Sequence, residues 1–202
     1  MEFRSGTRKP FPGFDRVYRA HDPGTPEFRA RVDDFSVEDA FAALRGERVP
    51  SVPVSARWVM GRRVPRDFIW TTLAVPFIAS DRVFDLLRKH AFTGWSTFPV
   101  ELLNDAGECI STYHGLVVYG RCGPRQKERS ALIAKLGPVG KTIEVYKGLF
   151  FDEHRWDGSD VFMPDDGTGL VFVVQEVRDA LTAAKVKGIS LDRADLEERL
   201  FA

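Results

Sequence analysis

One pattern occurs twice in this sequence: an apolar strand, a capped helix, a glycine and a second strand. The two copies span residues 75–103 and 169–200, and Gly94 of the first aligns with Gly188 of the second. Helices that pack on a sheet need apolar side chains at such spacings, so the match indicates either a repeated unit or the packing rule that any strand–helix–strand unit obeys. The matched pairs include Val83 and Val177, Asp85 and Asp179, Leu87 and Leu181, Phe92 and Val186, and Ser96 and Ser190.

The rest of the chain predicts an α+β fold, with a mixed or mainly antiparallel sheet and a few packed helices. Ser36, with Asp39 at the third helical position, is typical of a helix start, and Gly46 ends that helix. Asp192 is expected to cap a last helix that runs to Leu200. Alternating or continuous apolar runs predict strands at 14–19, 57–60, 68–71, 75–79, 95–102 and 116–119.

Length and composition fit one globular domain, 1–202, in which a Pro-rich region, 1–67, precedes the two similar units. Hydrophobic residues make up 44% of the chain, enough for a core without a disulfide or a structural metal. Cys109 and Cys122 are too few for a disulfide framework or a four-cysteine zinc site. The net charge of zero gives no reason to expect a nucleic acid or a membrane as a partner.

The N-terminus has no apolar stretch of the kind that a secretory signal needs. The longest apolar run, 73–79, is too short to span a bilayer. We therefore expect a cytoplasmic protein. The sequence leaves its oligomeric state open.

Reactive side chains form no complete catalytic or cofactor motif. Gly137–Thr142 is similar to the end of a phosphate-binding loop, but a lysine stands at 135 and a strand pattern follows. The four histidines lack metal-ligand spacing. Cys122 and His114 are the one pair that we name for an enzyme, since the neighbouring Arg121 favours a thiolate, and a buried structural cysteine is the alternative. We expect no catalytic residue, no cofactor and no metal.

Two charged segments are candidate surfaces. Residues 121–147 carry seven basic and two acidic residues, which suits phosphate contacts, but base-stacking aromatics are missing apart from Tyr146; a solvated face is the alternative. Residues 151–166 carry six acidic residues around Trp156. Charge steers the encounter of two proteins and an aromatic side chain anchors it, so this acidic loop is the predicted partner-binding site, with a merely solvated loop as the alternative. Its residues are Asp152, Glu153, Trp156, Asp157, Asp160, Asp165 and Asp166.

Two stretches resemble a known family. F-I-A-S-D-R-V-F-D-L-L-R-K-H-A-F-T-G-W-S-T-F-P-V-E-L, from Phe77, resembles the strand–S-E-R-V–helix–T-G–strand segment of immunity proteins from bacterial polymorphic toxin systems. The match is to the Myxococcus-type immunity family, formerly a domain of unknown function. W-D-G-S-D-V-F-M-P, from Trp156, with the helix and strand that follow it, is similar to that family's closing pattern. The resemblance covers roughly residues 68–200.

The chain also departs from that pattern. A related immunity group carries paired C-x-x-C-G motifs for zinc, of which only Arg121-Cys122-Gly123 is present here, and the second helix begins at Gln175-Glu176 rather than Ser-Glu-Arg. The resemblance implies a protein without catalytic residues or cofactor that binds and neutralises a cognate toxin domain. The alternatives are a small enzyme that uses Cys122 and His114, or a nucleic-acid-binding module that uses residues 121–147.

Overall fold

The computed structural model describes residues 9–24, 29–33, 36–61, 64–71, 78–110, 112–137 and 140–199. Within them, helices and mixed sheets form an α+β chain, which confirms the predicted fold class. The three α-helices are α1 (Val37–Leu44), α2 (Asp81–Lys89) and α3 (Gln175–Ala183). None of the helices in these ranges is long and apolar enough to cross a membrane.

The first sheet closes into a six-stranded barrel. Its order is β3-β2-β4-β5-β8-β6, and the parallel pairing of β3 with β6 closes the circle, while β7 (Cys109–Ile110) extends β6 as a hairpin. All six strands contribute to one cluster of buried side chains, so the barrel has a packed core rather than a channel. The strands are β2 (Arg29–Val32), β3 (Val54–Met60), β4 (Phe68–Thr71), β5 (Ile78–Ser80), β6 (Trp95–Leu103) and β8 (Tyr113–Val118).

The second sheet has the order β14-β1-β13-β12-β9. β1 comes from near the N-terminus and is antiparallel to both of its neighbours, whereas β9 runs parallel to β12. The largest hydrophobic cluster includes residues of this sheet, of the barrel and of the helices, so both sheets share one core. The strands are β1 (Val17–His21), β9 (Gly120–Cys122), β12 (Val161–Pro164), β13 (Val171–Val174) and β14 (Ser190–Arg193).

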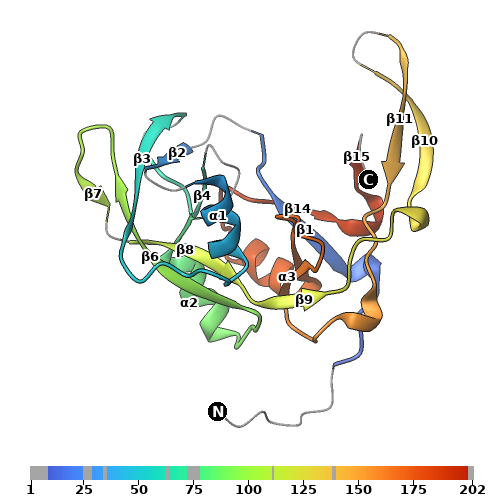
Figure 1. Cartoon of the computed structure of the whole chain (residues 1–202), viewed down its shortest axis with the longest axis horizontal. Coiled ribbons are helices and arrows are strands. Elements are labelled where there is room, and N and C mark those ends of the chain that lie inside the picture. The colour runs from blue at the N-terminus through green and yellow to red at the C-terminus, as the bar shows by residue number, and fades with distance from the viewer. Residues whose placement is uncertain are drawn as a thin grey trace.

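The third sheet is an arm. β10 (Ala131–Leu136) and β11 (Thr142–Lys147) form a long hairpin that extends away from the rest of the molecule (Figure 1), and β15 (Glu198–Arg199) pairs with β11 over two residues at its base. The two ends of the arm lie together, because the Ser130 hydroxyl donates to the Gly148 carbonyl at 2.8 Å. We call residues 131–147 the arm.

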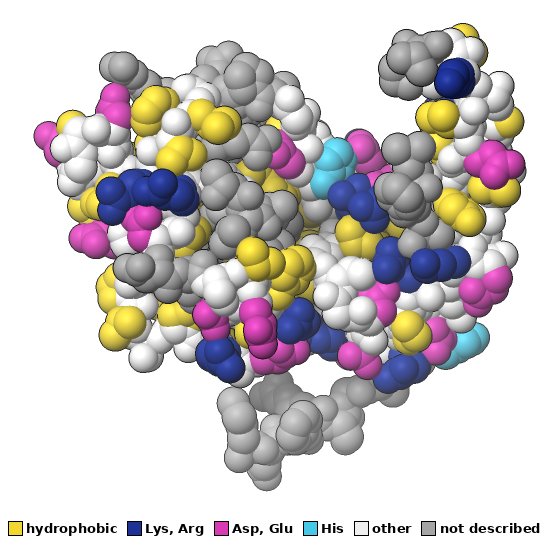
Figure 2. Space-filling view, turned by 45° about the horizontal axis from the view of Figure 1, so that its top comes forward, with side chains coloured by type: hydrophobic (Ala, Val, Ile, Leu, Met, Phe, Trp, Pro, Cys, Tyr) yellow, Lys and Arg dark blue, Asp and Glu magenta, His cyan; other side chains and the backbone are white. Residues whose placement is uncertain are grey.

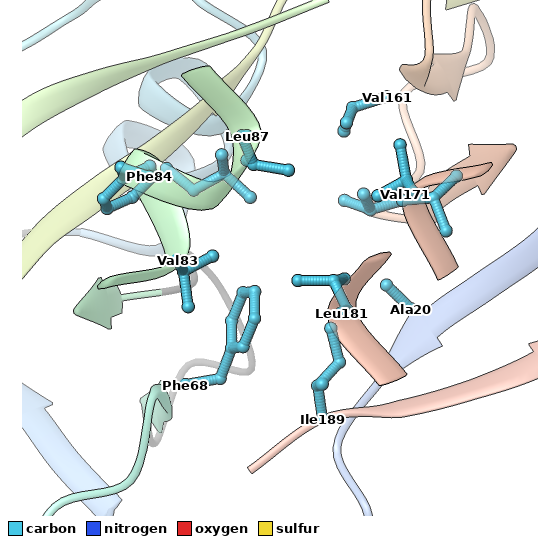
Figure 3. A pocket seen from close by; sticks show the side chains of 12 residues that line it. Ala20, Phe68, Val83, Phe84, Leu87, Val161, Val171, Leu181 and Ile189 are labelled. Atoms are coloured by element: carbon cyan, nitrogen blue, oxygen red, sulfur yellow. The ribbon is translucent and has the colours of Figure 1, made fainter. Parts of the chain in front are cut away.

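The helices begin where their sequences predict. Ser36 caps α1: its hydroxyl oxygen accepts from the Asp39 backbone N–H, and the hydroxyl donates to the Asp39 carboxylate at 2.7 Å. Helices α2 and α3 turn their apolar faces toward each other across a small cavity of about 30 Å³ (Figure 3). Only apolar side chains line the cavity, so water gains no hydrogen bonds by entering it.

The two similar units share their backbone geometry. Unit A consists of β4, β5, α2 and β6, and unit B of β12, β13, α3 and β14. The second residue after each helix has φ 54° (Ala91 or Lys185), and three residues later comes a glycine with positive φ (Gly94 or Gly188). In each, the second residue of that loop, Phe92 or Val186, donates its N–H back into the helix at 3.0 Å, and these acceptors are the matched carbonyls of Leu87 and Leu181.

Each unit also forms hydrogen bonds to the loop that follows the helix of the other unit. The Asp160 carboxylate, just before β12, accepts the Thr93 backbone N–H of unit A at 2.8 Å. Asp67, just before β4, accepts the Lys187 N–H of unit B at 2.9 Å. The first residues of β12 and β4 bind the same loops. The Val161 N–H donates to the Thr93 carbonyl, and the Phe68 N–H donates to the Lys187 carbonyl, both at 3.0 Å. A Cβ on Gly94 would lie 2.1 Å from the Val161 oxygen, and one on Gly188 2.3 Å from that of Phe68.

Some predicted elements differ in the structure. The last helix, expected from Asp192 to Leu200, is wrong: Asp192 lies in β14 opposite Arg19, a single 3-10 turn follows at Ala194–Leu196, and β15 then pairs with the arm. Strand pairing with distant segments outweighs the local capping signal. The strand expected at 14–19 begins at Val17, after a 3-10 turn, and residues 75–77 of the strand expected at 75–79 lie outside the described ranges.

Candidate functional site

Trp156 of the predicted acidic loop packs into the core. The Trp156 side chain is 3% exposed, packs against Phe11 and Phe162, and donates its indole N–H to the Ser159 carbonyl at 3.1 Å. Phe11 comes from the N-terminal segment, which the local sequence of the loop could not reveal. Trp156 is a core residue of this structure, and its contact with a partner stays a prediction.

Asp160 is also buried, at 7% exposed. Its carboxylate accepts from the Thr93 N–H and hydroxyl at 2.8 and 2.9 Å, and Lys9 approaches its other oxygen at 3.1 Å. A buried carboxylate is stable only when such donors satisfy it. The oxygens of Asp160 have partners inside the molecule, and its contact with another protein stays a prediction.

The other acidic residues of the loop have internal partners. Asp166 pairs with Arg125 and Glu153 with Arg129, each at 2.6 Å, and Asp165 pairs with Arg155 at 3.1 Å. Although burial opposes ionisation of Asp166, hydrogen bonds from Thr168 and Arg125 hold the pKa of that carboxyl below its ordinary value. The charges of these acidic residues are therefore paired within the molecule.

The loop covers the free edge of strand β9. The Arg121 N–H donates to the Asp157 carboxylate at 2.8 Å, and the Asp157 N–H donates back to the Arg121 carbonyl at 2.9 Å. The Gly123 N–H donates to the Asp152 carbonyl at 3.0 Å, and the Asp152 carboxylate caps the short 3-10 turn Glu153–Arg155. A sheet edge left open would expose these groups to other chains, so the loop has a structural task.

Cys122 and His114 lie on strands of different sheets. Cys122 is on β9 of the second sheet and 1% exposed, and burial raises the pKa of its thiol far above the usual range. His114 is on β8 of the barrel, where its Nε2 lies 2.9 Å from Asp81. The Arg121 guanidinium donates to the carbonyls of Val118, Gly120 and Arg45. The side chain expected to favour a thiolate is thus committed elsewhere.

Three of the seven basic residues in segment 121–147 pair with acidic side chains. Besides the pairs of Arg125 and Arg129 with acidic residues, Arg129 lies over the rings of Phe14 and Phe150, at 4.8 and 5.1 Å from their centroids. Lys135 pairs with Glu198 at the base of the arm. Gly137 follows the last residue of β10 and Thr142 is the first residue of β11, so the glycine-containing segment leads into a strand, as its sequence predicts, and not into a phosphate-binding helix.

The arm presents an apolar face that the sequence analysis missed. Cross-strand partners share a face, and register places Leu132 with Tyr146, Ala134 with Glu144 and Leu136 with Thr142 on one side, so Glu144 is the charged residue of a mainly apolar face. Leu132 is 53% and Leu136 79% exposed. Figure 2 shows apolar side chains along the arm at the upper right. The run A-L-I-A-K-L at 131–136 is largely apolar at both its odd and its even positions. Such a pattern is typical of a strand that is covered on both faces.

A groove opens beside the base of the arm. Its volume is about 630 Å³, and charged side chains of both signs line it with Tyr18, Leu191 and Leu196. Arg19 and Glu197 form an ion pair at its floor, where burial, together with nearby Arg199, lowers the pKa of Arg19 to about 10. His21 adds a contact to Asp192 at 2.6 Å. Among the described residues, no group of three or more His, Cys, Asp or Glu side chains could hold a metal ion.

Comparison with known proteins adds no family. No protein-family model matches the chain, and no curated protein matches it.

Proposed function

We propose that this chain is an immunity-type binding protein that neutralises a toxin domain in the cytoplasm by covering part of its surface. The observation that carries the proposal is the arm, whose outer face leaves Leu132 and Leu136 uncovered. The free energy falls when a partner covers apolar groups that are exposed to water, and exposed apolar surfaces are typical of interaction sites. The resemblance to immunity proteins supplies the class of partner.

Strand β10 supports this proposal with its backbone. It is the outer strand of its three-stranded sheet, and Lys135, its one charged residue, is tied to Glu198. Sheet edges are usually protected by free charges, prolines or a covering segment. An edge without such protection can pair with an extended segment of another protein, which adds main-chain hydrogen bonds to the side-chain contacts. We therefore expect the toxin domain to contact β10 with a strand.

The test is co-expression of this chain with the toxin domain encoded by the adjacent reading frame. Leu132→Asp combined with Leu136→Asp places two charges on the contact face, and we expect the dissociation constant to rise at least about tenfold and protection of the cells to fail. Val52→Asp is the matched control, because Val52 is 69% exposed and lies outside the arm. Titration calorimetry of the purified pairs gives the affinities.

Two outcomes would contradict the proposal. If both variants bind the toxin domain as tightly as the unaltered chain, the arm is not the contact. If the adjacent frame encodes no protein that forms a complex with this chain, the partner is not a toxin domain. Circular dichroism of the arm variant, which should match that of the unaltered chain, excludes unfolding as the cause of lost binding.

A further inference from the structure

Strands β1 and β8 occupy equivalent places. β8 lies between β5 and β6 of unit A, and β1 lies between β13 and β14 of unit B, each antiparallel to both neighbours. The registers also agree. Ser80 opposes Tyr113 in one unit, and its match Val174 opposes Val17 in the other. The further matched pairings are Ala79 with His114 and Val173 with Tyr18, Ser96 with Val117 and Ser190 with His21, and Pro99 with His114 and Arg193 with Tyr18.

The strands that follow in sequence repeat as well. After β1 comes β2, which pairs in parallel with β4 of unit A, and after β8 comes β9, which pairs in parallel with β12 of unit B. In sequence order, the first repeat therefore consists of β1, β2 and unit A, and the second of β8, β9 and unit B. In space, however, the first strand of each repeat completes the unit of the other: β1 lies in the sheet of unit B, and β8 lies in the barrel of unit A.

The side chains of the N-terminal segment, from Lys9 to His21, make their ion pairs and ring contacts with residues 129–197, in unit B and beside it. Its apolar side chains also reach unit A, because Ala20 lines the central cavity beside Phe68 and Val83. Lys9 reaches Asp160, and Phe11 packs on Phe151 and Trp156. The remaining contacts are those of Phe14 with Phe150, Phe151 and Arg129, of Arg16 with Gln175 and Glu176, of Tyr18 with Arg178, of Arg19 with Glu197, and of His21 with Asp192.

We infer that the chain is a duplication whose two copies have exchanged their first strands, and that the slot between β13 and β14 is a strand-acceptor site for residues 9–21 of a second copy. The slot holds Val17 at 0%, Tyr18 at 9% and Ala20 at 6% exposure, so it selects a segment with small or aromatic apolar side chains at these positions. The occupant in trans is the same segment of a second copy, as in other exchanges of identical elements.

The experiment uses the whole chain with a protease site inserted after Gly24. Gly24 is exposed and has open space around it, so the insertion leaves β1 in place. After cleavage, we expect the N-terminal fragment to remain bound through gel filtration. A fluorescein-labelled synthetic peptide of residues 9–24, in tenfold excess, should then replace it, and fluorescence anisotropy follows the replacement.

The control is the same peptide with Val17→Asp. It would place a carboxylate at a fully buried position, so its incorporation should be at least about tenfold lower. Incorporation of the unaltered peptide alone supports the acceptor site. Release of the fragment after cleavage overturns the inference, whether or not the remainder stays folded, and so does equal incorporation of both peptides. Neither result depends on the arm or on its proposed partner.

Discussion

Single side chains in this protein often have partners far along the sequence. The sequence predicts that Trp156 in the acidic loop anchors a partner, but Phe11 of the N-terminal segment packs against its ring. Ser36 shows the opposite case: its partner Asp39 is three residues away, and sequence reasoning placed the helix start correctly. Local signals fix a residue's role only when its competing partners are also local.

Cys122 tests the enzyme alternative at this scale. A cysteine attacks as its thiolate, and burial raises the pKa of this thiol far above neutrality. In iodoacetamide at pH 8, we expect Cys122 to be alkylated at least about tenfold more slowly than the exposed Cys109. Peptide mass spectrometry of the folded protein measures both rates. Alkylation of Cys122 as fast as Cys109 would show an accessible thiolate and revive the Cys122/His114 alternative.

Among the elements, helices and hairpins were easier to predict than the sheets they join. The strand at 68–71 and the turn into the strand from Trp95 follow from apolar runs and Gly94. The closure of the barrel does not, because β3 and β6 pair in parallel across about 45 residues, and nothing within either strand encodes its neighbour. The arm was missed for the same reason: an apolar strand predicts cover that the fold does not provide.

The arm is separable from the fold. Ala131 and Lys147 oppose each other at its base, so Asn-Gly in place of residues 132–146 would make a two-residue hairpin turn between them. We expect the shortened chain to fold and to lose about 2 kcal/mol at most, because among the described residues of 132–146 only Val145 is buried. Urea unfolding measures the loss. A chain that fails to fold would show that the arm supports the core, and retained toxin binding would contradict its proposed role.

At the scale of the whole molecule, the two units are tied by reciprocal contacts. Asp67 and Asp160 each stand before a strand of one unit and hold the loop of the other. The repeat of 94 residues in the sequence predicted that the units are similar, but not that they exchange contacts, because intra-unit and inter-unit pairing of a strand bury the same side chains.

Removal of these carboxylates should weaken the whole fold. Asp160→Ala leaves the Thr93 N–H and hydroxyl without their acceptor, so we expect a loss of about 1–3 kcal/mol in a single unfolding transition, and a similar loss for Asp67→Ala. Asp165→Ala is the control: its pair with Arg155 is exposed and should contribute below about 0.5 kcal/mol. Two separate transitions in urea, or equal losses for Asp160→Ala and its control, would refute this account.

The hydrogen bond from the Ser130 hydroxyl to the Gly148 carbonyl joins the two ends of the arm where they meet the rest of the molecule. Beyond that point the arm contacts the remaining structure through its short pairing with β15, so we expect changes in the length and composition of the outer part of the arm to leave the register of the sheets unchanged. If the arm binds the toxin domain as proposed, substitutions within residues 131–147 would change the partner at little cost to folding, as in binding loops carried on a rigid scaffold. Related chains would then differ in this segment and share the rest of the fold.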